Sequence, residues 1–147
     1  MQAAPDYDDV VAEVHRFLAE RIFSAEMSGI ANKKIVIDPG FGFGKTTAHN
    51  LALLARLERF ADLGVPVLAG LSRKRTIGEL TGRSDPRDRV HGSVAAHVIA
   101  AQRGARILRV HDVAATVDAL KVWNAVAVVP MPRTGASAGG ISWPDDG

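Results

Sequence analysis

The chain has 147 residues, of which 47% are hydrophobic and 23% charged, enough apolar side chains for one folded domain. Its 18 basic and 16 acidic side chains leave a formal net charge of +2, too small an excess to indicate a nucleic-acid partner. The absence of cysteine excludes disulfides, thiolate zinc sites and cysteine nucleophiles. No apolar run approaches the roughly 20 residues of a membrane span, and the first residues are acidic where a signal peptide is basic. We therefore expect a soluble, cytoplasmic protein with no membrane partner.

The first half of the chain predicts two helices and two strands. In residues 6 to about 27, apolar residues recur every three or four positions, which predicts an amphipathic helix. Residues 35–37 are a short β-branched run before an Asp-Pro-Gly turn, typical of a buried strand. A second helix is expected over residues 47 to about 63, ended by Gly64, and a second strand over residues 65–71. The inward face of the first helix is predicted to carry Val10, Val11, Val14, Phe17, Leu18 and Ile22.

The second half continues the alternation after a polar segment. Residues 79–89 are rich in turn residues and charge, which predicts a loop. A third helix is expected over residues 92–104, a third strand over 105–113 and a fourth helix from 116 to about 126. Residues 129–147 have no periodicity and many Gly, Pro, Ser and Asp residues, so we predict a flexible tail there.

This order of elements is typical of an α/β fold with a parallel sheet and crossover helices. Asp38, Lys74 and His111 stand at corresponding strand ends, 36 and 37 residues apart. Eight units of that length come to about 300 residues, close to the size of a (β/α)8 barrel. The chain is long enough for three such strands, so we predict part of a TIM barrel.

Chargeable side chains stand at the end of all three predicted strands. They are Asp38 after the first strand, Arg73 and Lys74 after the second, and Arg109, His111 and Asp112 at the third. In parallel α/β proteins, ligands bind at the carboxyl ends of the strands. A helix cap or a salt bridge would explain one such ending, but three in register favour a ligand site.

The residue types at these strand ends suggest the ligand's chemistry. The carboxylate of Asp38 can accept two hydrogen bonds from the edge of an amino-heterocycle, and Lys74 can donate to a ring oxygen or nitrogen. Arg109 and His111 alternate along a strand, so they point the same way and suit a phosphate or pyrophosphate. Together they predict a site for a heterocycle that carries an anionic leaving group.

The glycine-rich segment 40–45 does not match either common nucleotide-binding motif. A Walker motif would need glycine where Pro39 stands, and a dinucleotide fingerprint would need glycine where Lys45 stands. The glycines favour a tight strand-to-helix turn with close backbone approach to a ligand, and Phe43 is free to cover an aromatic ring. His49 is expected to cap or brace the next helix. His97 lies mid-helix among alanines, which favours a packing or surface position over a ligand role.

Three motifs in this order resemble the dihydropteroate synthase family, the folate-pathway enzymes that sulfonamides inhibit. They are "IVIDPGFGFGKTTAHN", "GLSRKR" and "RVHDV", and the resemblance covers about residues 1–127. The opening residues are similar to the segment after the family's fifth barrel strand. The resemblance therefore implies that residues 1–128 are the C-terminal part of a pterin-binding barrel domain, about its last three βα units with the preceding helix.

The resemblance implies a transferase that joins 6-hydroxymethyl-7,8-dihydropterin diphosphate to 4-aminobenzoate, giving 7,8-dihydropteroate and pyrophosphate. It also implies Mg²⁺, whose protein ligand belongs to the family's N-terminal half, so no metal ligand is expected in this chain. Arg75 departs from the serine that many members carry after the lysine. By resemblance, the pterin is bound by Asp38, Gly70, Lys74 and Arg109, the diphosphate by Arg109 and His111, and the aminobenzoate by Phe43 and Arg75, with Lys74 and Arg109 catalytic.

Because the family's first five strands are not in this sequence, we expect the isolated chain to be inactive or weakly active. The partners implied are the two small substrates and a second copy of the chain in a homodimer, or assembly with a separate N-terminal half. A pterin-binding domain of a methyltetrahydrofolate-corrinoid methyltransferase would also fit, although "SRKR" and "RVHDV" favour the synthase. The sequence is also compatible with a non-catalytic remnant that binds a pterin or a partner, and with a generic α/β domain.

Overall fold

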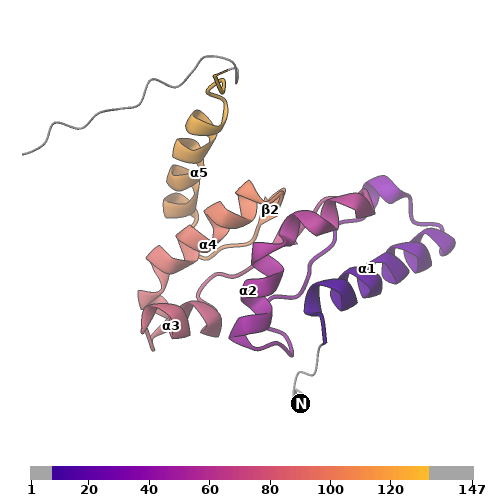
Figure 1. The fold of residues 1–147 in the computed structure, drawn as a ribbon, viewed down its shortest axis with the longest axis horizontal. Helices are drawn as coiled ribbons and strands as arrows, with labels where there is room; N and C mark the ends of the chain where they lie inside the picture. The colour runs from indigo at the N-terminus through magenta and orange to yellow at the C-terminus, as the bar shows by residue number, and fades with distance from the viewer. Residues whose placement is uncertain (1–7, 133–147) are drawn as a thin grey trace, which may run out of the picture.

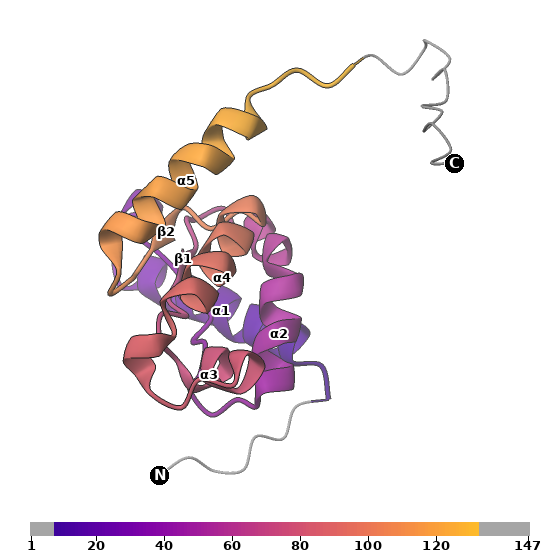
Figure 2. The same cartoon turned by 90° about the vertical axis from the view of Figure 1, so that its left-hand side faces the viewer.

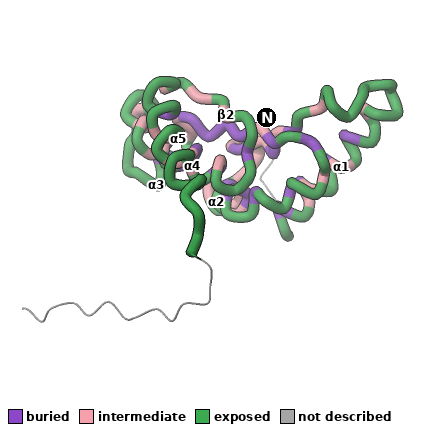
Figure 3. The backbone as a smooth tube through the Cα atoms, turned by 90° about the horizontal axis from the view of Figure 1, so that it is seen from above, coloured by how far each residue is buried: buried purple, intermediate pink, exposed green. Residues whose placement is uncertain are grey.

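The computed structural model describes residues 8–132. Helices α1 and α5 lie at opposite ends of the molecule, with the short strands between them (Figures 1 and 3). In chain order the elements are α1 (Val10–Met27), the 3-10 helix η1 (Asn32–Lys34), α2 (Thr47–Ala55), the 3-10 helix η2 (Leu57–Leu63), β1 (Leu68–Ala69), α3 (Arg75–Thr81), the 3-10 helix η3 (Pro86–Asp88), α4 (Val90–Gln102), β2 (Ile107–Leu108) and α5 (Val113–Ala127).

The strands are parallel, which confirms the predicted α/β class. Strands β1 and β2 pair with Leu68 opposite Ile107. A third strand position joins them at Ile37, whose N–H donates to Pro66 O at 3.0 Å and whose carbonyl accepts from Leu68 N at 2.8 Å. The regular pairing is shorter than the predicted strands 35–37, 65–71 and 105–113, because each outer strand in the described part of the chain has a neighbour on one side only.

The core lies between the strands and the helices. Phe41, Leu53, Leu57 and Phe60 are among its fully buried side chains, and Figure 3 shows the buried positions along the inside of the molecule. The start of α1 is capped by Asp9, whose carboxylate accepts from Val11 N at 3.1 Å and Ala12 N at 3.2 Å. The predicted inward face of this helix is buried except for Phe17, which is 59% exposed and contradicts that prediction.

Two helical segments differ from the prediction. The helix expected over residues 47–63 changes at Arg56 from α2 to the tighter η2, although it ends as expected at Gly64, where φ is +74°. Helix α3 was missed, and the predicted loop over residues 79–89 is wrong at its start because α3 runs to Thr81. Such a short helix, without a side-chain cap and with few apolar residues, leaves little periodicity to detect.

Gly92 permits the close approach of α4 to α3. A Cβ at this position would lie 2.7 Å from Ile77 Cγ2 and 2.9 Å from Thr81 Cγ2. We expect Gly92→Ala to lower the free energy of unfolding by about 1–3 kcal/mol through overpacking, despite the better helix propensity of alanine, worth about 1 kcal/mol. Urea unfolding followed by circular dichroism measures the change, and a gain in stability would contradict this account of the contact.

Helix α5 contributes little to the core. It projects away from the other helices (Figures 1 and 2), and Thr116 is its only buried residue. It ends at Ala127, close to the predicted end of the last helix. The flexible tail predicted over 129–147 lies outside the described residues beyond position 132. In the described part of the chain, none of the helices has the length and apolar character needed to cross a bilayer.

Candidate functional site

The three strand ends meet at the same edge of the sheet, as the parallel order predicted. Asp38 follows the strand position at Ile37, and its Oδ2 lies 3.8 Å from Nη2 of Arg109, which follows β2. Between them is Gly70, directly after β1. A Cβ on Gly70 would lie 3.1 Å from Arg109 Nη2, so a glycine leaves room for the guanidinium to lie across the strand.

A small cavity of about 200 Å³ contains most of the residues predicted to bind pterin and diphosphate. It is lined by Gly70, Ser72, Lys74, Arg109, Val110 and His111. Ser72 Oγ accepts from His111 N at 3.1 Å and lies 2.8 Å from His111 Nδ1. If Ser72 donates its hydroxyl proton to Nδ1, the imidazole carries its own proton on Nε2 and can donate it to an anion.

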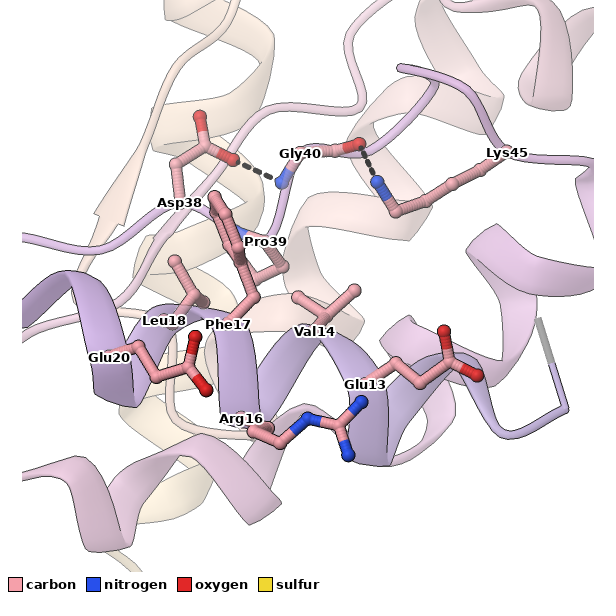
Figure 4. Close-up of a pocket in the computed structure, with 10 residues that line it drawn as sticks. All are labelled: Glu13, Val14, Arg16, Phe17, Leu18, Glu20, Asp38, Pro39, Gly40 and Lys45. Atoms are coloured by element: carbon pink, nitrogen blue, oxygen red, sulfur yellow. Dashed lines mark hydrogen bonds between the residues drawn. The ribbon is translucent and has the colours of Figure 1, made fainter. Parts of the chain in front are cut away.

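Asp38 lies in a neighbouring cavity of about 500 Å³ between α1 and the start of the glycine loop, which we define as residues 39–46. Figure 4 shows Asp38 Oδ1 accepting from Gly40 N at 2.8 Å, and Lys45 Nζ donating to Gly40 O at 2.9 Å. Burial lowers the pKa of Lys45, and the negative charge of Asp38 partly opposes this. Phe17, the exposed member of the predicted inward face of α1, lines this cavity beside Pro39 (Figure 4).

A third cavity, of about 610 Å³, contains the residues predicted to bind aminobenzoate. Phe43 and Arg75 both line it, together with Lys74. The ammonium of Lys74 donates to Phe41 O and lies 4.9 Å from the centre of the Phe43 ring. Burial lowers the pKa of Lys74, Asp38 opposes this, and the positive charges of Arg109 and Lys45 lower it further.

The three cavities adjoin through shared residues. Lys74 lines both the small cavity and the third cavity, and Lys45 lines both the Asp38 cavity and the third cavity. The structure therefore brings all the predicted site residues to one region, although they line three different cavities. Arg75 is less available than predicted, because its Nε lies 2.5 Å from Glu79 Oε1 in an ion pair. Their roles in binding stay predictions.

Arg73 holds an unusual backbone conformation just before Lys74. Its φ is +58°, the only positive value of a non-glycine residue in the described part of the chain. Its N–H donates to Ser93 Oγ at 2.9 Å, and its carbonyl accepts from Arg89 Nη1 at 2.8 Å. Its guanidinium donates to both oxygens of Asp112, at 2.8 and 3.2 Å, and lowers the pKa of that carboxyl. Hydrogen bonds to three partners therefore fix the conformation of Arg73, the residue just before Lys74.

Several buried polar residues near the site, among them Asn50 and His97, were not predicted as site residues. Asn50 is the last residue of the motif "TTAHN", and its side chain accepts a hydrogen bond from the glycine loop. The sequence signal that could have indicated this role is a polar amide at a helix position where an apolar core residue is expected. His97 is fully buried, which agrees with the predicted packing position and excludes the surface position. Its Nδ1 donates to Ser93 O at 2.6 Å and its Nε2 accepts from Leu71 N at 3.2 Å, so the ring is neutral. His49 caps α2 together with Thr46, as predicted.

Residues 8–132 contain no group of three His, Cys, Asp or Glu side chains that could hold a metal ion. Mg²⁺ is bound in proteins mainly through carboxylates, phosphates and water. Asp38, the carboxylate nearest the predicted diphosphate residues, is engaged by Gly40 N and Arg109. In the described part of the chain, this carboxylate is therefore already engaged by protein partners.

Comparison with known proteins defines the class of protein. Residues 1–111 match the family of pterin-binding enzymes, and the chain belongs to this family. Among curated proteins, it is 54% identical over 131 residues to the dihydropteroate synthase of Neisseria meningitidis serogroup B, a match covering 87% of this chain and 46% of that protein. It is 53% identical over 125 residues to the Escherichia coli K12 enzyme, covering 85% of this chain and 44% of that protein. These matches confirm the resemblance drawn from the motifs.

Solved structures of dihydropteroate synthases have a similar fold over the part that this chain covers. The dihydropteroate synthase of Xanthomonas albilineans in complex with 7,8-dihydropteroate matches with a TM-score of 0.86 and 72% identity, covering 88% of this chain and 50% of that chain. The same enzyme with 4-aminobenzoic acid matches with a TM-score of 0.85 and 74% identity, covering 86% of this chain and 46% of that one. The chain thus spans about half the length of the relatives it matches.

Proposed function

We propose that this chain forms the C-terminal part of a dihydropteroate synthase barrel, its last three βα units with the preceding helix. The complete site would condense 6-hydroxymethyl-7,8-dihydropterin diphosphate with 4-aminobenzoate. The observation that carries this proposal is the convergence of Asp38, Lys74 and Arg109 from three parallel strand ends around Gly70. The relatives reported above are all named dihydropteroate synthase, which favours the synthase over a corrinoid methyltransferase.

In the proposed reaction, the bond between the pterin methylene carbon and the diphosphate oxygen breaks, and its electron pair leaves with pyrophosphate. The amine nitrogen of aminobenzoate forms the new bond to that carbon and then loses a proton. Arg109 and the Nε2–H of His111 would donate to the departing oxygens, where negative charge grows. Asp38 would accept from the pterin's amino edge, and Lys74 would donate to its ring oxygen or nitrogen.

Phe43 would cover the ring of aminobenzoate, because it is exposed and lines the same cavity as Lys74. Arg75 would meet the carboxylate of aminobenzoate after exchange with Glu79, or through its backbone N–H at the start of α3. Magnesium, which the family resemblance implies, would be held by the diphosphate and by side chains outside this chain. We expect the reaction to take place in the cytoplasm.

The open face of the sheet supports the need for further barrel strands. By strand register, Val36, Leu68 and Ile107 share the face that carries Asp38 and Arg109, and Val36 and Ile107 are exposed. In a closed barrel this face lies inside and is filled by side chains. We therefore propose assembly with the remaining strands of a barrel, and self-association through α5, which exposes several valines, as the competing outcome.

Pterin binding tests the proposed site. Calorimetric titration with an unreactive dihydropterin diphosphate analogue should show weak binding to the chain, weakened about 10- to 100-fold by Asp38→Asn. The substitution keeps the shape of the side chain but turns one acceptor into a donor, and hydrogen bonds to charged groups contribute about 1.5–3 kcal/mol. Asp118→Asn, at an exposed position of α5, is the control. Equal affinity of Asp38→Asn and wild type would remove the pterin assignment.

Measurement of turnover tests whether the chain needs the rest of the barrel to form an active site. Pyrophosphate release should be undetectable for the chain alone and should appear when it is mixed with the N-terminal half of the Xanthomonas albilineans enzyme. Size-exclusion chromatography of the mixture separates assembly from self-association. A steady rate of dihydropteroate formation by the chain alone would show that the rest of the barrel is not required.

A further inference from the structure

The buried side chain of Asn50 joins the glycine loop to the start of α3. Asn50 is only 2% exposed. Its Oδ1 accepts from Gly42 N at 2.9 Å, and its Nδ2 donates to Thr76 Oγ1 at 2.8 Å. Gly42 directly precedes Phe43, and Thr76 directly follows Lys74 and Arg75 in the chain. One amide therefore connects the two segments that line the third cavity, which is proposed to bind aminobenzoate.

The two connected segments also pack directly on each other. A Cβ on Gly42 would lie 3.2 Å from Lys74 Cδ, so the glycine rests against the stem of the lysine. The lysine's ammonium reaches Phe41 O and the Phe43 ring, on either side of Gly42. A displacement of Gly42 would therefore change the position of the ring relative to the ammonium.

Burial makes the amide hard to replace. Thr76 is also buried, at 5% exposure, so water has little access to either bond of Asn50. A buried polar group that loses its partner keeps the cost of desolvation without the compensating hydrogen bond. Truncating the amide would leave Gly42 N without this acceptor and release the loop to move or to admit water.

We propose that Asn50 is a positioning residue that sets the Phe43 ring relative to the Lys74 ammonium, through its bonds to Gly42 and Thr76. Its importance for a substrate rests on the proposed function, whereas the coupling of the two segments does not. When the link is broken, the Lys74 ammonium becomes more solvated. The charged groups that influence it are Asp38, Arg109 and Lys45, and none of them bonds to Asn50.

The test measures the pKa of Lys74 directly in the complete chain. Lysines are dimethylated with ¹³C, the Lys74 signal is assigned with Lys74→Arg, and its pKa is measured by NMR titration. In Asn50→Ala and in Thr76→Val, the Lys74 pKa should rise toward the ordinary value of about 10.4. Thr76→Ser keeps the hydroxyl and should retain the wild-type pKa. Val11→Ala, a core truncation in α1, should lower the unfolding midpoint without changing Lys74.

An unchanged Lys74 pKa in folded Asn50→Ala, or an equal rise in Val11→Ala, would overturn the proposal. If Asn50→Ala does not fold, the comparison of Thr76→Val with Thr76→Ser decides, because a matching pKa in these two proteins also overturns it. Binding of the dihydropterin diphosphate analogue to wild-type protein is measured separately. Failure to bind would remove the proposed function and leave the measured coupling intact.

Discussion

A Phe60→Ala protein should lose about 3–5 kcal/mol of its free energy of unfolding. Phe60 lies in η2, is fully buried and belongs to the single cluster that joins α1, η2 and the strands. Its ring also packs against the imidazole of His15, with the ring centres 5.8 Å apart. Removing it takes away apolar contact and leaves a cavity that the surrounding helices fill only in part, which explains the size of the effect.

Phe17→Ala is the matched control for this experiment. Phe17 is also a phenylalanine in a helical segment, but its exposed position predicts a loss within about 0.5 kcal/mol. Guanidinium unfolding followed by circular dichroism gives both values, provided that the denaturant dependence of the free energy is the same in the three proteins. Similar losses for the two variants would contradict the core described above.

His97→Leu should also lower the free energy of unfolding, by less than Phe60→Ala. It removes the acceptor of Leu71 N, and a buried group left unpaired costs about 1–3 kcal/mol. It also removes the bond from the ring to Ser93 O, which keeps its place in the hydrogen bonding of α4. Because Leu71 precedes Ser72 and Arg73, the end of β1 should also loosen. Amide hydrogen exchange at residues 71–74 should therefore accelerate in the variant, in addition to a lower free energy of unfolding.

Burial of the neutral His97 also predicts a pH dependence. Burial lowers its pKa in the folded protein below the ordinary value, Ser93 O opposes this, and the charge of Lys74 adds to the lowering. The unfolded chain, with a histidine pKa of about 6.5, therefore binds the proton more readily. Its contribution to stability is complete above about pH 6.5 and is lost as the pH falls toward the folded pKa.

Denaturation of wild type and His97→Leu between pH 7.5 and 5 measures this contribution. The difference in free energy of unfolding between the two proteins should shrink as the pH falls. Only the wild type loses the stability that neutral, buried His97 contributes. His91→Leu, at an exposed position of α4, should leave the slope of wild type unchanged. A stability difference independent of pH would show that His97 is not held neutral by the fold.

Local signals explain which parts of the fold could be predicted. The alternation of elements, the helix end at Gly64 and the cap at His49 depend on neighbouring residues, and all three are found in the structure. The convergence of Asp38, Lys74 and Arg109 could also be predicted from the sequence, because parallel strands place their carboxyl ends at one edge of the sheet. That step needs only the order of the elements, not their exact lengths.

Long-range partners explain what could not be predicted. Asn50 and Thr76 are 26 residues apart, as are Leu71 and His97, and nothing in the local sequence pairs them. The exposure of Phe17 has the same origin, since helical spacing shows which residues share a face but not how wide the contact with the core is. The division of the site into three cavities likewise depends on where long side chains such as Lys74 come to rest.

The left-handed backbone at Arg73 bears on how a ligand would associate with this edge of the sheet. Its three partners are Ser93 in α4, Arg89 just before that helix, and Asp112, so folding itself orders the main chain that presents Lys74. An arriving anion or heterocycle would meet a rigid surface, and little conformational entropy would be lost locally on association. Loosening Ser93 or Asp112 would therefore give the main chain beside Lys74 a freedom that any ligand at this edge would have to remove on binding.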